Sequence, residues 1–152
     1  MPRAPFNAFT FLYRKSKDGE FEYALLKRAD CGVWHGASGG GEEGETPIEA
    51  AKRETFEEAG IPSDSDFTQL DTISYIPAVG FRDCELWGDD VYVIPQYYFA
   101  VLTETQDPVL SREHLEYKWV GFSEAHDMLH FQADKIALWE LNQRVQGKGP
   151  RD

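Results

Sequence analysis

The sequence predicts an α+β fold, formed as a single domain over residues 1–152. Three observations lead to this prediction. Strand-like runs outnumber helical patterns, and the helical patterns fall only in the middle and at the end of the chain. No linker or internal repeat interrupts the chain. The composition, 41% hydrophobic with ten Phe, seven Tyr and four Trp, is that of a globular domain with its own core.

The strands are predicted from apolar and β-branched runs that are separated by turn residues. They are expected near residues 5–13, 21–28, 68–76, 91–103 and 114–121. A polar hairpin turn from Ser16 to Gly19 joins the first two. Segment 61–66 is expected to be a loop because of its Pro and Asx content, and Gly80 to Asp90 is expected to be a long connection.

The first predicted helix covers residues 47–59 and has a clear start signal. Thr46 is a suitable N-cap, Pro47 suits the first helical position, and Glu49 completes a capping box with Thr46. The helix is therefore expected to begin at residue 47.

Two more helices are predicted near the C-terminus. Ser123 is expected to cap a short helix that runs to about Leu129. An amphipathic helix is expected from Asp134 to Gln146, closed by Gly147.

The first helix has an apolar stripe and an acidic stripe. On a 3.6-residue period the apolar stripe contains Ile48, Ala51, Thr55 and Ala59. Glu54, Glu57 and Glu58 gather on the opposite side, where like charges at i+3 and i+4 cost about 0.2–0.5 kcal/mol per pair. A cation would reverse that repulsion, and Mg²⁺ prefers oxygen ligands. The five glycines of the segment Gly36 to Gly44 are expected to form a tight turn that presents bare backbone to a ligand.

The glutamate-rich face also has a simpler interpretation, because glutamate is a good helix former and a solvated face needs charge. Arg53 likewise fits an ordinary i,i+4 ion pair with Glu57. We assign Arg53 this structural role rather than a catalytic one.

The spacing of seven residues around this helix resembles the Nudix box. The matching positions are Gly39, Glu45, Arg53, Glu54, Glu57, Glu58 and Gly60. At roughly 7% usage per residue type, a chance match at a given start has a probability on the order of one in 10⁸. The resemblance implies the Nudix fold, in which a mixed sheet and a smaller antiparallel sheet are sandwiched between helices. It also implies that Arg53 and Glu45 brace the loop and the helix.

A second resemblance lies in the segment from Ser111 to Val120. It is similar to the Glu-His-x-x-Tyr-Arg/Lys-Trp stretch of two Nudix branches, the dihydroneopterin triphosphate pyrophosphatases and the asymmetric diadenosine tetraphosphate hydrolases. This similarity implies that Glu113 completes the metal and water site. Glu116 is the alternative, and a third interpretation is that both are surface charges on an edge strand.

Residues outside the box are candidates for substrate binding. Arg28 ends the second predicted strand, from which its planar guanidinium could reach a phosphate, although a solvated basic strand end is an equal alternative. Trp34, just before the box, resembles an aromatic residue of many Nudix enzymes that stacks a base or packs under the loop. His35 is interpreted as a loop histidine, because no second His or Cys stands at metal-ligand spacing.

Together these resemblances imply a Mg²⁺-dependent pyrophosphohydrolase, with Mn²⁺ as a possible substitute. It would cleave a diphosphate linkage in a nucleoside or pterin triphosphate, giving a monophosphate and pyrophosphate. The metals would be held by Glu54, Glu57, Glu58, Glu113 and the backbone carbonyl of Gly39, with Glu54 or Glu113 as general base. The alternatives are an asymmetric diadenosine tetraphosphate hydrolase and a non-catalytic, nucleotide-sensing Nudix domain.

The charge and the cysteine content limit the partners and the location. A net charge of −12 argues against a nucleic acid duplex or a membrane surface as partner, because both polyanions select basic patches. Cys31 and Cys84 alone form neither a disulfide framework nor a zinc site. With no signal peptide and no run of 18 apolar residues, we expect a cytoplasmic protein, and its oligomeric state stays open.

Overall fold

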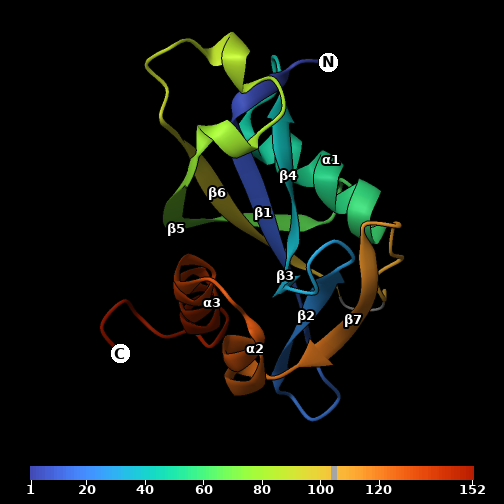
Figure 1. Cartoon of the computed structure of the whole chain (residues 1–152). Helices are drawn as coiled ribbons and strands as arrows, with labels where there is room; N and C mark the ends of the chain where they lie inside the picture. The colour runs from blue at the N-terminus through green and yellow to red at the C-terminus, as the bar shows by residue number, and fades with distance from the viewer. Residues whose placement is uncertain (104–105) are drawn as a thin grey trace.

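The computed structural model describes residues 1–103 and 106–152 (Figure 1). The described strands are β1 (Arg3–Lys15), β2 (Phe21–Arg28), β3 (Trp34–His35), β4 (Ala37–Glu42), β5 (Asp66–Pro77), β6 (Val93–Leu102) and β7 (His114–Val120). The helices are α1 (Pro47–Ala59), α2 (Phe122–Met128) and α3 (Gln132–Val145), and two 3₁₀ turns lie at Ala78–Gly80 and Cys84–Trp87. Every strand and helix expected from the sequence is present, with ends that differ by at most two residues.

The strands form one continuous mixed sheet with the order β3-β2-β1-β6-β5. The long strand β1 joins its two parts. The N-terminal half of β1 pairs with β4 antiparallel and β1 pairs with β6 parallel, while its C-terminal half pairs with β2 antiparallel. β2 also pairs with β3 and β7, so that this part of the sheet is antiparallel. The expected combination of a mixed and a smaller antiparallel part is therefore confirmed, although the two parts share strand β1.

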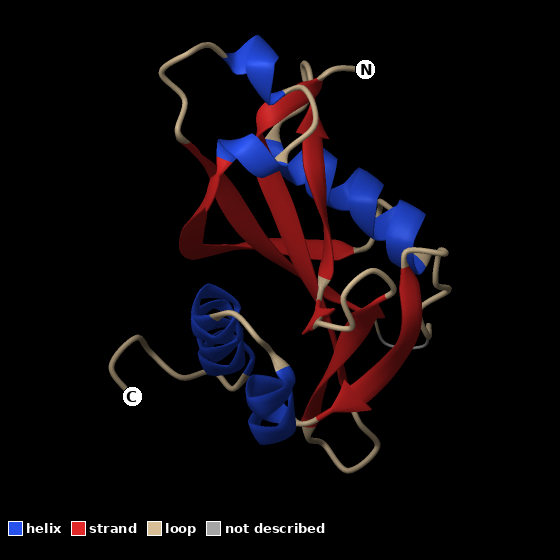
Figure 2. Ribbon diagram, in the orientation of Figure 1, coloured by secondary structure: helices blue, strands red, loops and turns tan. Residues whose placement is uncertain are grey.

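The helices cover the two sides of the sheet. α1 lies on one side, and α2 and α3 lie on the other (Figure 2). Alternate residues of the strands face these two layers. Phe9 belongs to the core that includes Leu138 of α3, whereas Ala8 and Phe99 pack against Ala51 of α1. The period-2 pattern of the buried strands thus places one core on each side of the sheet.

Helix α1 begins and ends where its capping residues predict. The side chain of Thr46 accepts a hydrogen bond from the backbone N–H of Glu49, and the Glu49 side chain accepts one from the backbone N–H of Thr46. Gly60 ends the helix in the left-handed conformation with φ 72°, which costs a glycine little. The capping box is confirmed, and it fixes the start of the helix against strand β4.

The glycine-rich segment is not the tight turn that the sequence suggested. Residues Ala37–Glu42 form strand β4, which pairs with β1, and within segment 36–44 only Gly44 has a positive φ. Glycine is needed there for close approach instead, because a Cβ at Gly36, Gly40 or Gly41 would overlap Thr10, Arg3 or Phe6. The prediction failed because a run of glycines is compatible both with a tight turn and with a strand that other groups approach closely.

Two expectations about the helices were also wrong. Ser123 lies inside α2, whose N-cap is Gly121 without a side-chain hydrogen bond. The three glutamates of α1 do not all lie opposite its packed stripe, since Glu54 and Glu58 are themselves buried, with 9% and 4% exposure. They turn toward β4 together with the small residues of α1, because glycines in β4 leave room for carboxylates between helix and strand.

Across the described residues, no helix is long and apolar enough to cross a membrane.

Candidate active site

A cavity of about 330 Å³ brings together the carboxylates that the sequence singled out. Glu54, Glu57 and Glu58 of α1 and Glu113, just before β7, all line it, and so does Gly39 of β4. Residues 74 positions apart in the chain, Gly39 and Glu113, therefore meet at one site. The structure thus places all five predicted metal-site residues around a single hollow.

Arg53 braces this cavity from the side of α1. Its Nε and Nη2 contact the two carboxylate oxygens of Glu45 at 2.8 and 3.0 Å, and Nη2 also donates to the carbonyl of Gly40 at 2.9 Å. Nη1 donates to Glu54 at 2.8 Å and to Glu57 at 3.4 Å. The guanidinium therefore ties helix, strand and loop together, which is the structural role predicted for it.

The carboxylate of Glu54 lies directly against the backbone of Gly39. A Cβ at Gly39 would overlap the Glu54 carboxylate, so the strand can carry only glycine at this point without moving the glutamate. Burial raises the pKa of Glu54, although the hydrogen bond and the charge of Arg53 oppose the rise. The site thus holds a carboxylate and bare backbone in close contact.

Glu58 and Glu113 form a carboxyl pair. Glu58 is anchored at 2.8 Å by the backbone N–H of Ser38, and its carboxyl lies beside that of Glu113. Burial, and then the neighbouring carboxyl of Glu113, raise the pKa of Glu58 to about 9. Near pH 7 the carboxyl of Glu58 therefore favours its neutral form, and a bound cation would favour its ionised form.

The donor chemistry of this cavity fits a divalent cation with hard oxygen ligands. Its acidic groups are carboxylates crowded against one another and against a backbone strand, and Mg²⁺ takes oxygen ligands. As the described side chains stand, no three His, Cys, Asp or Glu converge tightly enough to hold a metal ion. Arg53 spans the space between Glu54 and Glu57, so that the carboxylates have to turn toward a cation that enters.

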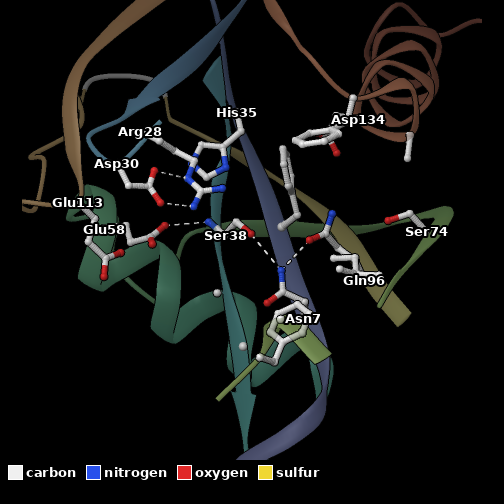
Figure 3. A pocket seen from close by; sticks show the side chains of 18 of the residues that line it. Asn7, Arg28, Asp30, His35, Ser38, Glu58, Ser74, Gln96, Glu113 and Asp134 are labelled. Carbon is white, nitrogen blue, oxygen red and sulfur yellow. Dashed lines mark hydrogen bonds and ion pairs between the residues drawn. The ribbon is translucent and has the colours of Figure 1, made fainter. Parts of the chain in front are cut away.

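A second, larger cavity of about 800 Å³ adjoins the first. Gly39, Glu58 and Glu113 line both cavities. Figure 3 shows Glu58 and Glu113 at one end of the larger cavity and Asp134, Ser74 and Gln96 at the other. We call the first end the carboxylate end and the second the polar end. Together the cavities provide room for a ligand with a charged part and a heterocyclic part.

Arg28, at the end of β2, lines the larger cavity. Asp30 holds its guanidinium through two hydrogen bonds, at 3.0 and 2.6 Å. The hydrogen bond and charge of Asp30 raise the pKa of Arg28 even though burial opposes the rise. Arg28 therefore stands as a cation beside the carboxylate end, where a phosphate would need one.

The structure does not bring Trp34 or Glu116 to either cavity. Trp34 packs at the edge of the core shared with α2 and α3, and the ammonium groups of Lys27 and Lys118 lie 5.9 and 5.6 Å from its ring centroid. Of the two interpretations for Trp34, packing is the one that this position favours. Of the two glutamates near β7, only Glu113 lines the cavities.

Sequence reasoning missed a histidine pair in the wall of the larger cavity. The Nε2 atoms of His35 and His114 lie 2.8 Å apart, although the residues are 79 positions apart in the chain. Burial, with the charge of His114 second, lowers the pKa of His35 to about 3, and burial lowers the pKa of His114. Both rings are therefore neutral near pH 7. Only the pairing of β2 with both β3 and β7 brings them together, and spacing in the sequence could not reveal it.

It also missed the hydrogen-bonded residues of the polar end. Asn7, Ser74, Gln96, Tyr98 and Asp134 come from β1, β5, β6 and α3 and are joined by hydrogen bonds of 2.6–3.1 Å. Each is a common residue in its own segment. Only the order of the strands in the sheet makes them neighbours.

Comparison with known proteins places the chain among one group of hydrolases. A model of the NUDIX domain matches residues 5–139. An asymmetrical bis(5'-nucleosyl)-tetraphosphatase of Sus scrofa is 37% identical over 125 residues, 78% of each chain. The Mus musculus protein of the same description is 33% identical over 141 residues, covering 87% of this chain and 86% of its own.

Solved structures show the same fold. A chain described as a NUDIX hydrolase from Listeria monocytogenes has a TM-score of 0.84 at 32% identity, with 96% of this chain and 99% of that chain covered. An Ap4A hydrolase of C. elegans has a TM-score of 0.74 at 24% identity (95% and 99% covered). The dihydroneopterin triphosphate pyrophosphohydrolase of E. coli has a TM-score of 0.72 at 20% identity (93% and 99% covered).

Proposed function

Because the chain belongs to the Nudix hydrolase family, which acts on phosphoric anhydrides, we propose that it is a Mg²⁺-dependent hydrolase of a small nucleotide or pterin polyphosphate. The observation that carries the proposal is that the smaller cavity gathers five carboxylates and bare glycine backbone, with Glu54, Glu57, Glu58 and Glu113 among the carboxylates. That cavity opens into a larger one of about 800 Å³, which is within the usual size of small-molecule sites.

The chain's own residues would position the polyphosphate and the attacking water. Glu54, Glu57, Glu58 and Glu113, with the carbonyl of Gly39, are the proposed metal ligands. Divalent cations bound there would neutralise the phosphate charge and acidify the attacking water. Mn²⁺ is a possible substitute because it accepts the same oxygen ligands.

Among the arginines that line the two cavities, Arg28 and Arg53 have different tasks. Arg28 lies in the larger cavity, where its guanidinium can bind a phosphate oxygen once the contact with Asp30 is exchanged. Arg53 stays committed to Glu45 and the carbonyl of Gly40, which keeps the helix aligned with β4. Of these two arginines, Arg28 is therefore the one proposed to bind substrate.

The general base is proposed to be Glu54 or Glu113. Glu54 is buried against Gly39 and held by Arg53, so that its position is fixed. Glu113 is exposed and paired with Glu58, so that it can move with the bound ligand. A pH profile of turnover for Glu54→Gln and Glu113→Gln separates them, because loss of the base removes the acidic limb of the profile.

The first proposed substrate type is a nucleoside or pterin triphosphate, cleaved to a monophosphate and pyrophosphate. The single polar end supports it, because one heterocycle can occupy that end while the phosphates reach the carboxylates. The second type is a dinucleoside tetraphosphate, cleaved asymmetrically. It is supported by relatives at 33–37% identity that are described as asymmetrical bis(5'-nucleosyl)-tetraphosphatases.

A purely ligand-sensing domain is the remaining alternative. A domain without metal chemistry has little reason to crowd Glu54, Glu58 and Glu113 around one hollow, since their repulsion costs stability. Binding of a nucleotide with no hydrolysis across a broad substrate panel would support the sensor.

The test is a substrate panel with Mg²⁺, and in parallel with Mn²⁺, read by product mass. It contains dihydroneopterin triphosphate, canonical and oxidised nucleoside triphosphates, and dinucleoside tetraphosphates. A monophosphate with pyrophosphate identifies the first substrate type, and a nucleoside triphosphate with a monophosphate identifies the second. Absence of metal-stimulated hydrolysis for every compound would contradict the proposed enzyme.

A further inference from the structure

The hydrogen bonds at the polar end of the larger cavity all run in one direction. Asn7 donates through Nδ2 to Gln96 Oε1 at 2.6 Å, and Gln96 donates through Nε2 to the hydroxyl oxygen of Tyr98 at 2.9 Å. The hydroxyl of Tyr98 in turn donates to Asp134 Oδ1 at 2.7 Å. The chain of donors therefore ends on a carboxylate, which can only accept while it is ionised.

The hydroxyl of Tyr98 has no capacity left for a ligand. Its one hydrogen points to Asp134, so Ser74, which lies 3.1 Å away, has to act as a donor to it. The phenol oxygen then accepts from both Gln96 and Ser74, which fills its two lone pairs. The hydroxyl of Tyr98 therefore holds its neighbours in place and does not bind a ligand directly.

Asp134 is the residue of the polar end that can accept further hydrogen bonds. It is 4% exposed, it lines the cavity, and Tyr98 is the one donor to its side chain in the part of the chain that the structure describes. A buried carboxylate with a single neutral donor keeps unused acceptor capacity, which is costly in the absence of a ligand. Any ligand group that meets Asp134 gains most if it donates hydrogen bonds.

We infer that Asp134 recognises a heterocycle that presents two adjacent N–H donors, the ring N–H and amino group of a guanine or a 2-amino-4-oxopterin, and that it discriminates against adenine. The inference rests on the proposed function, which places the phosphates at the carboxylate end. Such paired donors match the two oxygens of a carboxylate in the same way as a guanidinium does. Adenine instead presents its amino group beside a ring nitrogen whose lone pair would face the carboxylate.

The walls and the length of the cavity agree with this placement. Tyr75, Phe81 and Phe131 line it and provide aromatic faces for a planar ring. Asp134 lies at the end opposite Glu58 and Glu113 (Figure 3), so that a base at one end leaves its phosphates free to reach the other. Selection by Asp134 does not depend on whether the substrate is a triphosphate or a dinucleoside tetraphosphate.

The test compares substrates that differ only in the base. The pairs are GTP with ATP and diguanosine with diadenosine tetraphosphate, and dihydroneopterin triphosphate is added as the pterin. Each is assayed with wild type, with Asp134→Asn and with Glu140→Gln. Glu140 is the matched control, because it also ties α3 to the sheet, through the backbone N–H groups of Asp71 and Thr72, but lies outside both cavities.

We expect wild type to prefer the guanine and pterin compounds. Asp134→Asn should lower kcat/KM for them by about 10- to 100-fold and leave the adenine compounds within about threefold, since a lost bidentate contact has this magnitude. Glu140→Gln should leave the ratio unchanged. Equal use of both bases by wild type, or an equal loss for both in Asp134→Asn, would overturn the inference and show that Asp134 only anchors α3.

Binding without metal separates this inference from the proposed function. Calorimetry with guanosine and adenosine, without metal, should show tighter binding of guanosine by wild type and loss of that preference in Asp134→Asn. If no compound is hydrolysed but guanosine is selected, the proposed enzyme fails and the role of Asp134 stands. If hydrolysis occurs and neither assay shows a base preference, the proposed function stands and the role of Asp134 fails.

Discussion

Replacing Asp134 by Asn is expected to raise the free energy of unfolding, because the buried, ionised carboxylate of Asp134 destabilises the folded protein. Burial raises the pKa of Asp134 from 3.8 to about 6, although the hydrogen bond from Tyr98 opposes the rise. The folded protein therefore binds this proton more tightly than the unfolded chain does. The contribution of Asp134 to stability is most favourable below pH 3.8 and is lost as the pH rises through 6.

The magnitude follows from the two pKa values. At pH 8 the ionised carboxylate costs about 3 kcal/mol relative to a chain in which its pKa is unchanged, and at pH 5 it costs about 1.6 kcal/mol. Asn does not titrate and can still accept the hydrogen bond from Tyr98. The advantage of Asp134→Asn should therefore grow by about 1.4 kcal/mol between pH 5 and pH 8.

Urea unfolding followed by tryptophan fluorescence at pH 5, 6, 7 and 8 measures this difference. Glu140→Gln is again the control. Burial alone would raise the pKa of Glu140, but hydrogen bonds from Thr72, Asp71 and Arg144 outweigh it and lower the pKa. The stability that Glu140 contributes is lost only when the pH falls below the pKa of an ordinary glutamate. The Glu140→Gln variant should therefore be destabilised almost equally at all four pH values. An Asp134→Asn advantage that stays constant or shrinks toward pH 8 would refute the reasoning.

Three further substitutions test the other parts of the site. Gly39→Ala should lower turnover at least tenfold, measured under saturating Mg²⁺, because the new Cβ overlaps the carboxylate of Glu54. Arg53→Lys should lower the free energy of unfolding in urea by about 1–3 kcal/mol, since Lys cannot reproduce the forked contact with Glu45. His35→Gln should make the free energy of unfolding in urea depend less on pH below about 6.5. Buried with a pKa of about 3, neutral His35 costs wild type about 2 kcal/mol at pH 5, and this loss grows as the pH falls from 6.5 toward 3.

Most of the fold follows from local signals in the sequence. The capping box of Thr46 and Glu49 and the left-handed Gly60 fix both ends of α1, and alternating apolar residues mark the long strands. Strand β4 escaped prediction because glycines have no side chain to show a period. Its glycines allow other groups, such as the carboxylate of Glu54, to pack directly against the strand backbone. No local sequence pattern indicates that contact.

The two ends of the candidate site differ in how far the sequence reveals them. The smaller cavity takes most of its proposed metal ligands from one helix, so that the spacing of Glu54, Glu57 and Glu58 indicates it directly. The polar end takes its residues from three strands and one helix, and Gln96 and Tyr98 link Asn7 to Asp134 because β6 lies between β1 and β5. The chemistry of cleavage is therefore easier to predict from the sequence than the choice of base.

The measurement that bears most directly on the proposed function is the Mg²⁺ dependence of turnover in wild type and Glu57→Gln. The Glu57 side chain is 55% exposed, so that its loss should leave the fold intact, as checked by urea unfolding. Glu49→Gln, on the same helix but outside both cavities, is the control, since Gln also completes a capping box. Saturable Mg²⁺ activation in wild type and Glu49→Gln, with turnover abolished in Glu57→Gln, is the predicted result. Ordinary rates in a folded Glu57→Gln variant would contradict the carboxylate site.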